Sequence, residues 1–142
     1  MKILILAVGR LKEDHWKAAE ADYLKRLRRY ADVQVREVKD DAALLAAVPP
    51  RARLVLLDER GPCRTSEELA RSLVAAEEQH GGGRPLCLAV GGAEGFSAAA
   101  RARGPETLAF GRITLPHRLA RIVLYEQLYR AFTIVRGEPY HK

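Results

Sequence analysis

Apolar residues occur along this chain in two alternating arrangements, and each predicts one kind of secondary structure. Short continuous apolar runs bounded by turn residues are typical of strands that are buried on both faces. Clear runs of this kind lie at residues 1–8, 53–58 and 86–90, with weaker ones at 33–38 and 107–110. We therefore expect five strands.

The segments between these runs carry apolar residues at helical spacing with charges elsewhere, as amphipathic helices do. We expect helices at residues 14–29, 40–48, 65–80, from about residue 97, and 116–135.

Several of these helices have recognisable ends. Thr65 and Glu68 have the spacing of a capping box, in which each side chain bonds the backbone N–H of the other residue. Pro49 stops the second helix, the glycines from Gly81 stop the third, and Gly137 ends the last one.

Strands that alternate with helices predict an α/β fold with a mainly parallel sheet and helices on both faces. No repeat or low-complexity linker interrupts the chain, so we expect a single domain over residues 1–142. In such sheets, ligands bind outside the carboxyl ends of the strands. The loops at that edge are therefore the expected location of a binding site.

The last expected helix carries apolar residues on two opposite sides. Leu119 and Ile122 mark one side, and Leu124 and Leu128 mark the other. A helix that is apolar on two sides is buried twice. One side can pack on the chain's own sheet, and a partner subunit is the simplest cover for the other.

Two charged residues of this helix, Glu126 and Arg130, are spaced i to i+4 and can form an ion pair. A desolvated ion pair costs energy unless its geometry is good. The pair is therefore either structural or part of a site, and the sequence leaves both interpretations open.

A net charge of +6 and a pI near 9.6 give the protein a positive field that attracts polyanions such as nucleic acids. Cations interleaved with aromatic residues suit phosphates and bases. Such a cluster lies on the first expected helix, at Lys17, Lys25, Arg26, Arg28 and Arg29. A solvated helix face with its aromatic residues turned inward explains this pattern equally well.

The apolar run at the amino terminus is too short to span a membrane and lacks the cleavage site of a signal peptide. We therefore expect a cytoplasmic protein that does not enter a membrane. Cys63 and Cys87 are far apart and have no His cluster near them. They predict reduced structural thiols, and no metal site is expected.

The glycine-rich segment Gly91–Gly95 follows a buried strand and is the first candidate for ligand binding. Glycine lets the backbone approach a ligand closely and leaves main-chain groups free to bond it. The segment matches neither a dinucleotide fingerprint nor a phosphate loop. A plain glycine-rich turn is the alternative.

Two further segments are candidates for chemistry. The main chain of Phe110–His117, together with Leu57 from a neighbouring strand end, could hold an adenine ring. By itself, His117 is more typical of a packing or capping residue. The terminal Tyr140-His141-Lys142 combines an aromatic, a titrating group and a cation, although composition alone favours a frayed tail.

Taken in order, these segments resemble the ribosomal large subunit methyltransferase H family, of the SPOUT class of knotted methyltransferases. The resemblance spans nearly the whole chain, from Lys2–Arg10 through Leu57-Asp58 and Gly91–Gly95. Its most specific parts are Thr114–His117, Glu126–Ala131 and Gly137–Lys142.

The resemblance implies methyl transfer from S-adenosylmethionine to N3 of a pseudouridine in 23S rRNA, on the assembled ribosome. It also implies a homodimer with a deep C-terminal trefoil knot. On matching positions, the catalytic and RNA-facing candidates are Arg130, Tyr140 and His141. The residues expected to contact the cofactor are Leu57, Gly91, Phe110, Gly111, Arg112, Ile113, Thr114 and Leu115.

This sequence departs from the family's usual pattern in four places. Ala93 replaces a common proline, Gly111 stands where a serine is frequent, and the region 40–50 is short. Main-chain contacts tolerate the first two changes. Lys142 replaces a usual arginine, which keeps the charge but loses the bidentate fork for a phosphate.

The expected chemistry requires near-attack geometry and a deprotonated ring nitrogen. Our hypothesis is that Arg130 supplies positive potential, His141 assists deprotonation and Tyr140 positions the base.

Two other classes remain as alternatives. One is a non-catalytic basic RNA-binding or ribosome-associated factor, which would not bind S-adenosylmethionine. The other is a flavodoxin-like domain for a phosphorylated small molecule, which the absence of a phosphate loop disfavours.

Overall fold

The computed structural model describes the backbone of residues 1–141 and the side chains of residues 1–140. Five strands form one sheet in the order β2-β1-β4-β3-β5, and every neighbouring pair is parallel. The strands are β1 (Lys2–Val8), β2 (Asp32–Val38), β3 (Arg53–Leu57), β4 (Leu86–Val90) and β5 (Thr107–Leu108).

Helices connect successive strands. They are α1 (Asp14–Leu27), α2 (Asp41–Ala47), α3 (Ser66–Leu69), α4 (Ala76–His80), α5 (Ala98–Arg103) and α6 (His117–Arg136). A π-helical stretch, η1 (Ala70–Ala75), joins α3 and α4 into one continuous helix. A short 3-10 turn, η2 (Pro139–His141), follows α6.

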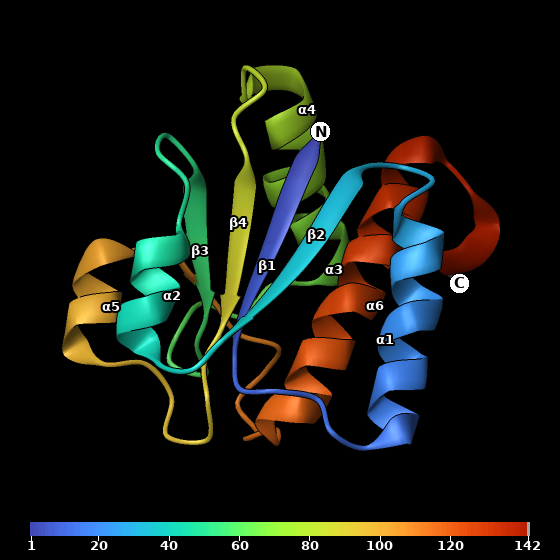
Figure 1. Cartoon of the computed structure of the whole chain (residues 1–142). Helices are drawn as coiled ribbons and strands as arrows, with labels where there is room; N and C mark the ends of the chain where they lie inside the picture. Colours follow the sequence, from blue (N-terminus) through green and yellow to red (C-terminus); the bar gives the residue numbers. More distant parts are fainter. Residues whose placement is uncertain (142) are drawn as a thin grey trace.

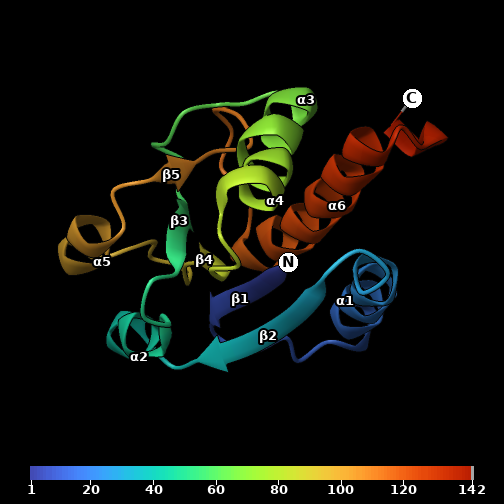
Figure 2. The same cartoon turned by 90° about the horizontal axis from the view of Figure 1, so that it is seen from above.

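Helices cover both faces of the sheet, as Figures 1 and 2 show: α1, α3, α4 and α6 on one side and α2 and α5 on the other. Successive side chains of a strand point to opposite faces, and β1 shows the consequence. Ile3 and Ile5 pack in the core under α1 and α6, whereas Leu6 packs in the core under α2 and α5.

The α/β class with a parallel sheet covered on both faces is confirmed. The capping box is also confirmed, because Thr65 Oγ1 accepts from Glu68 N–H at 3.1 Å and Glu68 accepts from Thr65 N–H at 3.4 Å. The fifth strand is shorter than predicted, since only Thr107 and Leu108 pair with β3 at the sheet edge. The trefoil knot and the single domain stay predictions.

One side of α6 is buried, and the other is only partly covered within this chain, although Ile122, which was predicted for that other side, is buried at 9% exposure. Tyr125, Leu128 and Phe132 are almost inaccessible to solvent, whereas Leu119 and Val123 are half-buried. Although α6 has 20 residues, no helix in the described part of the chain is long and apolar enough to cross a membrane.

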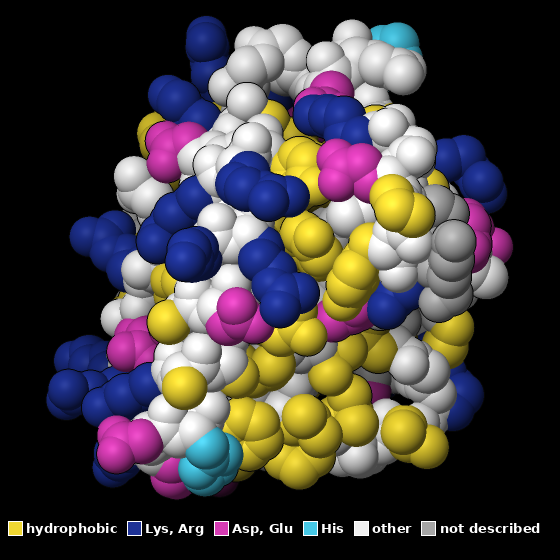
Figure 3. Space-filling model, turned by 90° about the vertical axis from the view of Figure 1, so that its right-hand side faces the viewer, with side chains coloured by type: hydrophobic (Ala, Val, Ile, Leu, Met, Phe, Trp, Pro, Cys, Tyr) yellow, Lys and Arg dark blue, Asp and Glu magenta, His cyan; other side chains and the backbone are white. Residues whose placement is uncertain are grey.

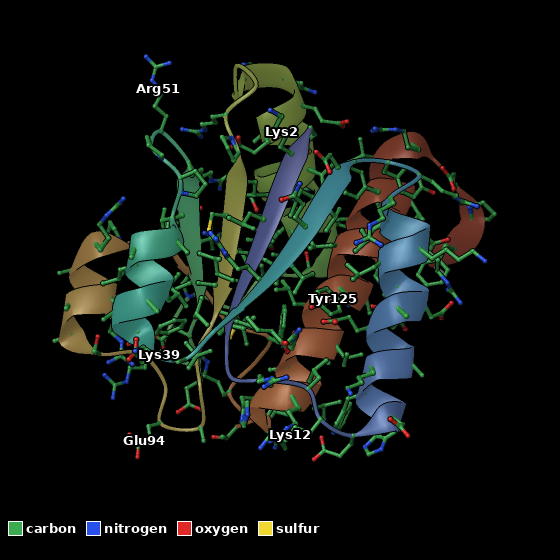
Figure 4. The ribbon with its side chains drawn as sticks, viewed as in Figure 1. Lys2, Lys12, Lys39, Arg51, Glu94 and Tyr125 are labelled. Carbon is green, nitrogen blue, oxygen red and sulfur yellow. The ribbon has the colours of Figure 1, made fainter. Side chains whose placement is uncertain are left out.

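A buried ion-pair network holds α6 against α1 and β2. The Arg121 side chain is 4% exposed, and its guanidinium bonds Glu20 at 2.6 Å and Glu37 at 2.9 Å. Tyr125 Oη donates to the same Glu20 carboxylate at 2.5 Å, and Figure 4 shows Tyr125 in the interior beside the sheet. Burial alone would lower the pKa of Arg121, but these partners outweigh it and keep the group charged.

Replacing Arg121 with Met should destabilise the fold because it leaves Glu20 and Glu37 without their cation. We expect the free energy of unfolding to fall by about 2–4 kcal/mol. This is somewhat less than the loss for a fully buried ion pair, because the carboxylates of Glu20 and Glu37 are partly exposed to solvent. Urea unfolding at fixed protein concentration measures it. Arg118→Met is the matched control, since Arg118 is more exposed and lies 3.6 Å from Glu13, and it should cost below about 1 kcal/mol. Equal losses in the two variants would contradict the structural role of Arg121.

Candidate active site

A cavity of about 520 Å³ opens at the carboxyl ends of β3, β4 and β5. Leu57 ends β3, Val90 ends β4 and Ala109 follows β5, and all three line it. The volume lies within the usual range for pockets that bind small molecules and cofactors. The cavity is thus at the edge of the sheet where ligands are expected in this fold class.

The glycine segment forms one wall of this cavity. Gly91 is buried at the end of β4, and a Cβ atom there would lie 3.3 Å from the carbonyl carbon of Gly95. Gly95 has φ +75°, and its N–H donates to Gly92 O at 3.0 Å to close the turn. Glycine is therefore favoured at Gly91, where a Cβ atom would crowd the Gly95 backbone, and at Gly95, where φ is positive. At the tip of this loop, Glu94 points away from the molecule (Figure 4).

The segment from Phe110 to Pro116 forms the opposite wall and leads into α6. Thr114 Oγ1 donates to Glu59 Oε2 at 2.8 Å, which ties this segment to the loop after β3. Ile113 is 72% exposed at the cavity and is the one large apolar side chain that stands out in solvent among residues 1–140. An apolar group in that position is suited to contact with a ligand or a partner chain.

Arg112 is placed differently from its neighbours. Its guanidinium donates to Gly61 O and lies 2.8 Å from Cys63 Sγ, outside the residues that line the cavity. Of the residues expected to contact the cofactor, the other seven do line it, namely Leu57, Gly91, Phe110, Gly111, Ile113, Thr114 and Leu115. Their contact with a cofactor stays a prediction.

An ion pair lies in the cavity wall. Asp58 follows β3, its side chain is 5% exposed, and it accepts from Arg101 Nε at 2.8 Å and from Arg60 N–H at 3.1 Å. Burial alone would raise the pKa of Asp58, but these hydrogen bonds outweigh it and hold the pKa below its usual value. The carboxylate therefore stays charged and braces α5 against the end of β3.

His117 lines the cavity from the first turn of α6. Burial, together with the charge of Arg118, lowers the pKa of His117 below its usual value. The imidazole is therefore neutral at physiological pH and offers both a donor and an acceptor to a bound molecule.

The expected catalytic residues form a second cluster on α6 and the tail. Arg130 Nη2 donates to Glu126 Oε2 at 2.8 Å, and Tyr140 Oη donates to the same oxygen at 2.8 Å. The guanidinium of Arg130 also lies over the Tyr140 ring, 5.0 Å from its centroid. Glu126 therefore holds Arg130 and Tyr140 together, and the expected Glu126–Arg130 pair is confirmed. The side chain of His141 and the whole of Lys142 lie outside the described residues.

The pKa values in this cluster define what its groups can do. Burial and the hydrogen bond to Glu126 raise the pKa of Tyr140 to about 12, so the phenol stays protonated at neutral pH. Burial would raise the pKa of Glu126, but the bonds from Arg130 and Tyr140 outweigh it and lower the pKa. Because its one proton is donated to Glu126, Tyr140 is suited to positioning and to accepting a hydrogen bond through Oη, not to acting as a base.

The two groups of predicted site residues are not brought together within one chain. The cavity touches α6 only through His117 and Ala120 in its first turn. Arg130 lies thirteen residues beyond His117, a distance of roughly 20 Å along a helix that rises 1.5 Å per residue. A single chain therefore keeps its cavity and its Arg130–Tyr140 cluster apart.

Sequence analysis missed several residues of the site. The sequence indicated Asp58, because it is an acid directly after a buried strand. Its partner Arg101 lies 43 residues away, and nothing in the sequence indicated it. His117 was interpreted as a packing residue, although it lines the cavity. The bond from Tyr140 to Glu126 was also missed, because nothing local in the sequence indicates that the tail folds back on α6.

Comparisons with known proteins agree with this architecture. The model of a family described as "Predicted SPOUT methyltransferase" matches residues 1–141. Proteins named ribosomal RNA large subunit methyltransferase H from Anaeromyxobacter sp. and Bacillus pumilus are 44% and 40% identical, each over 100% of both chains.

A solved structure, TrmJ from Z. mobilis, has a TM-score of 0.56 at 18% identity and covers 94% of this chain and 70% of its own. That likeness concerns the fold alone. The family model and the full-length identities decide the assignment: the chain belongs to the SPOUT methyltransferase family, among the proteins named ribosomal RNA large subunit methyltransferase H.

Proposed function

We propose that this protein is an S-adenosylmethionine-dependent methyltransferase that modifies N3 of a pseudouridine in 23S rRNA on the assembled ribosome. The observation that carries the proposal is the cavity at the strand ends, which is lined by Leu57, Gly91 and most of the 110–115 segment that the family resemblance marks for the cofactor. Such a substrate places the enzyme in the cytoplasm.

The residues around the cavity fit S-adenosylmethionine. Apolar side chains of Leu57, Phe110 and Leu115 suit an adenine ring, and the main chain at Gly91 and Gly111 can approach it without a Cβ atom. The departures Ala93 and Gly111 leave these main-chain groups in place. When bound, S-adenosylmethionine supplies an electrophilic methyl group on its sulfonium.

The remaining chemistry is carried out by Glu126, Arg130 and Tyr140, which we call the Arg130 cluster, together with His141. Removing the N3 proton of the pseudouridine leaves a ring anion, which the Arg130 guanidinium stabilises by its charge. Tyr140, protonated at neutral pH, positions the ring by hydrogen bonding, and His141 receives the N3 proton. Glu126 keeps Arg130 and Tyr140 in a fixed relative geometry.

The active form is a homodimer in which the Arg130 cluster of one subunit serves the cavity of the other. Two observations support this: the roughly 20 Å along α6 between the cavity and Arg130, and a half-buried stripe on the same helix. The stripe recurs every three or four residues at Leu119, Val123, Glu126, Arg130 and Ile134. A two-fold dimer buries the same patch of both subunits and forms two equivalent sites.

Loss of the protein should remove one methyl group from 23S rRNA. Mass spectrometry of the rRNA from a strain lacking it should show an unmethylated pseudouridine, and the purified enzyme with S-adenosylmethionine should restore the methyl group on the ribosomes of that strain. A methylated pseudouridine that persists in the deletion strain would refute the assignment.

Distorting the glycine wall of the cavity should weaken cofactor binding. Gly91→Val places a branched side chain against the Gly95 backbone, and we expect the Kd for S-adenosylmethionine to rise by about tenfold or more because the wall must shift. Isothermal titration calorimetry measures it. Ala102→Val, at an exposed position of α5, is the control and should bind normally. Unchanged affinity in a folded Gly91→Val protein would move the cofactor site elsewhere.

Subunits with different defects should complement each other. Gly91→Val removes one subunit's cavity, and Arg130→Ala removes the other's cation, so each homodimer is inactive. A heterodimer isolated through two affinity tags retains one intact cavity beside one intact Arg130 cluster, and should show about half of the wild-type activity. An inactive heterodimer would mean that each site is built within one chain.

A further inference from the structure

We propose that three exposed cations at the carboxyl end of α1, Lys25, Arg28 and Arg29, bind the phosphodiester backbone of the RNA substrate. The proposal rests on the proposed function. It adds the surface that binds the parts of the RNA other than the target base. None of the three residues lines the cavity.

The charge at this end of α1 is only partly compensated, with Glu138 near Arg29. Lys25, Arg28 and Arg29 are exposed and form no ion pair among the described residues. Asp22 is the one acid on this half of the helix, and it pairs with Arg26 at 3.1 Å. A surface that keeps its cations free attracts a polyanion and releases counterions when phosphates bind.

The three cations are spaced for one extended anion. Lys25 and Arg29 are four residues apart around the end of α1, and long flexible side chains can adjust to neighbouring phosphates. Figure 3 looks onto the side of the molecule formed by α1 and α6, and Lys and Arg side chains gather there beside an apolar area.

This end of α1 is packed directly onto the tail that carries Tyr140. Tyr30 Oη donates to Glu138 Oε2 at 2.7 Å, and the Tyr30 ring stacks on Phe132 at 5.2 Å. The Arg26 guanidinium lies over Tyr129, whose ring meets Tyr140 edge-on at 4.6 Å. RNA whose target base reaches Tyr140 therefore passes beside the exposed cations of the same subunit.

Helix stability does not account for all three cations. Cations in the last turn of a helix interact favourably with its dipole, and this explains Lys25. Arg29 lies beyond the end of the helix at Leu27. Its side chain is exposed and lies over the ring of Tyr30 at 5.7 Å, and Tyr30 and Glu138 beside it raise its pKa, so a full positive charge stands at the surface beside the tail.

The test compares the wild type with the triple variant Lys25→Gln, Arg28→Gln, Arg29→Gln. Steady-state methylation is measured on unmethylated large ribosomal subunits between about 50 and 200 mM KCl, a range over which phosphate contacts weaken strongly. The triple variant should show a KM raised about tenfold or more, an unchanged kcat and unchanged affinity for S-adenosylmethionine. Its log KM should depend on log salt with a slope smaller by about 2–3, the value for three lost phosphate contacts.

The matched control removes the same charge elsewhere, with Arg51→Gln, Arg71→Gln and Arg103→Gln. These three are exposed and form no ion pair among the described residues. Figure 4 shows Arg51 in solvent at the end of the molecule opposite Glu94. The control should change KM by less than about twofold, since only the diffuse field is reduced.

Each outcome has a defined meaning. An unchanged KM in the α1 variant, or an equal effect of the control, overturns this inference while leaving the proposed function intact. A variant that elutes as a monomer identifies the three cations as subunit contacts and also overturns it. A wild type that transfers no methyl group overturns the proposed function instead. If the triple variant does not fold, Lys25→Gln with Arg29→Gln keeps the contact of Arg28 Nε with Val33 O at 3.4 Å and gives the same comparison.

Discussion

The burial of one side of α6 is the constraint on which the rest of the molecule depends. Apolar contacts through Tyr125, Leu128 and Phe132 drive that burial but are non-directional. The Arg121 guanidinium adds direction, because its bonds to Glu20 and Glu37 fix how α6 is rotated against α1 and β2. The first turn of α6 then closes the cavity, and its second half holds Glu126 and Arg130 in the orientation that receives the tail.

The cavity follows from the parallel sheet. All strands end at one edge, so the loops after β3, β4 and β5 converge there. Glycine residues in two of these loops let the backbone approach a ligand closely. The Asp58–Arg101 pair lies in the cavity wall and braces α5 against the end of β3.

Because the cavity and the Arg130 cluster lie apart within one chain, the proposed dimer is needed to bring them together. One subunit contributes the cofactor pocket, and the other contributes the cation, the phenol and the neighbouring basic end of α1. Under this arrangement, the protein is active only when both subunits are assembled, and the RNA contacts mainly the subunit that supplies the tail. A chain of 142 residues thereby presents to a large substrate more surface than it has alone.

The sequence by itself determined the strands, the helices and the capping box at Thr65 and Glu68, because these depend on periodicity and on residues a few positions apart. Family motifs marked the segments that line the cavity. Only the tertiary structure decided that Arg101 meets Asp58, that Tyr30 meets Glu138 across 108 positions, and that Arg130 lies far from the cavity. Such contacts depend on how whole elements pack against one another, and no local pattern of side chains records that packing.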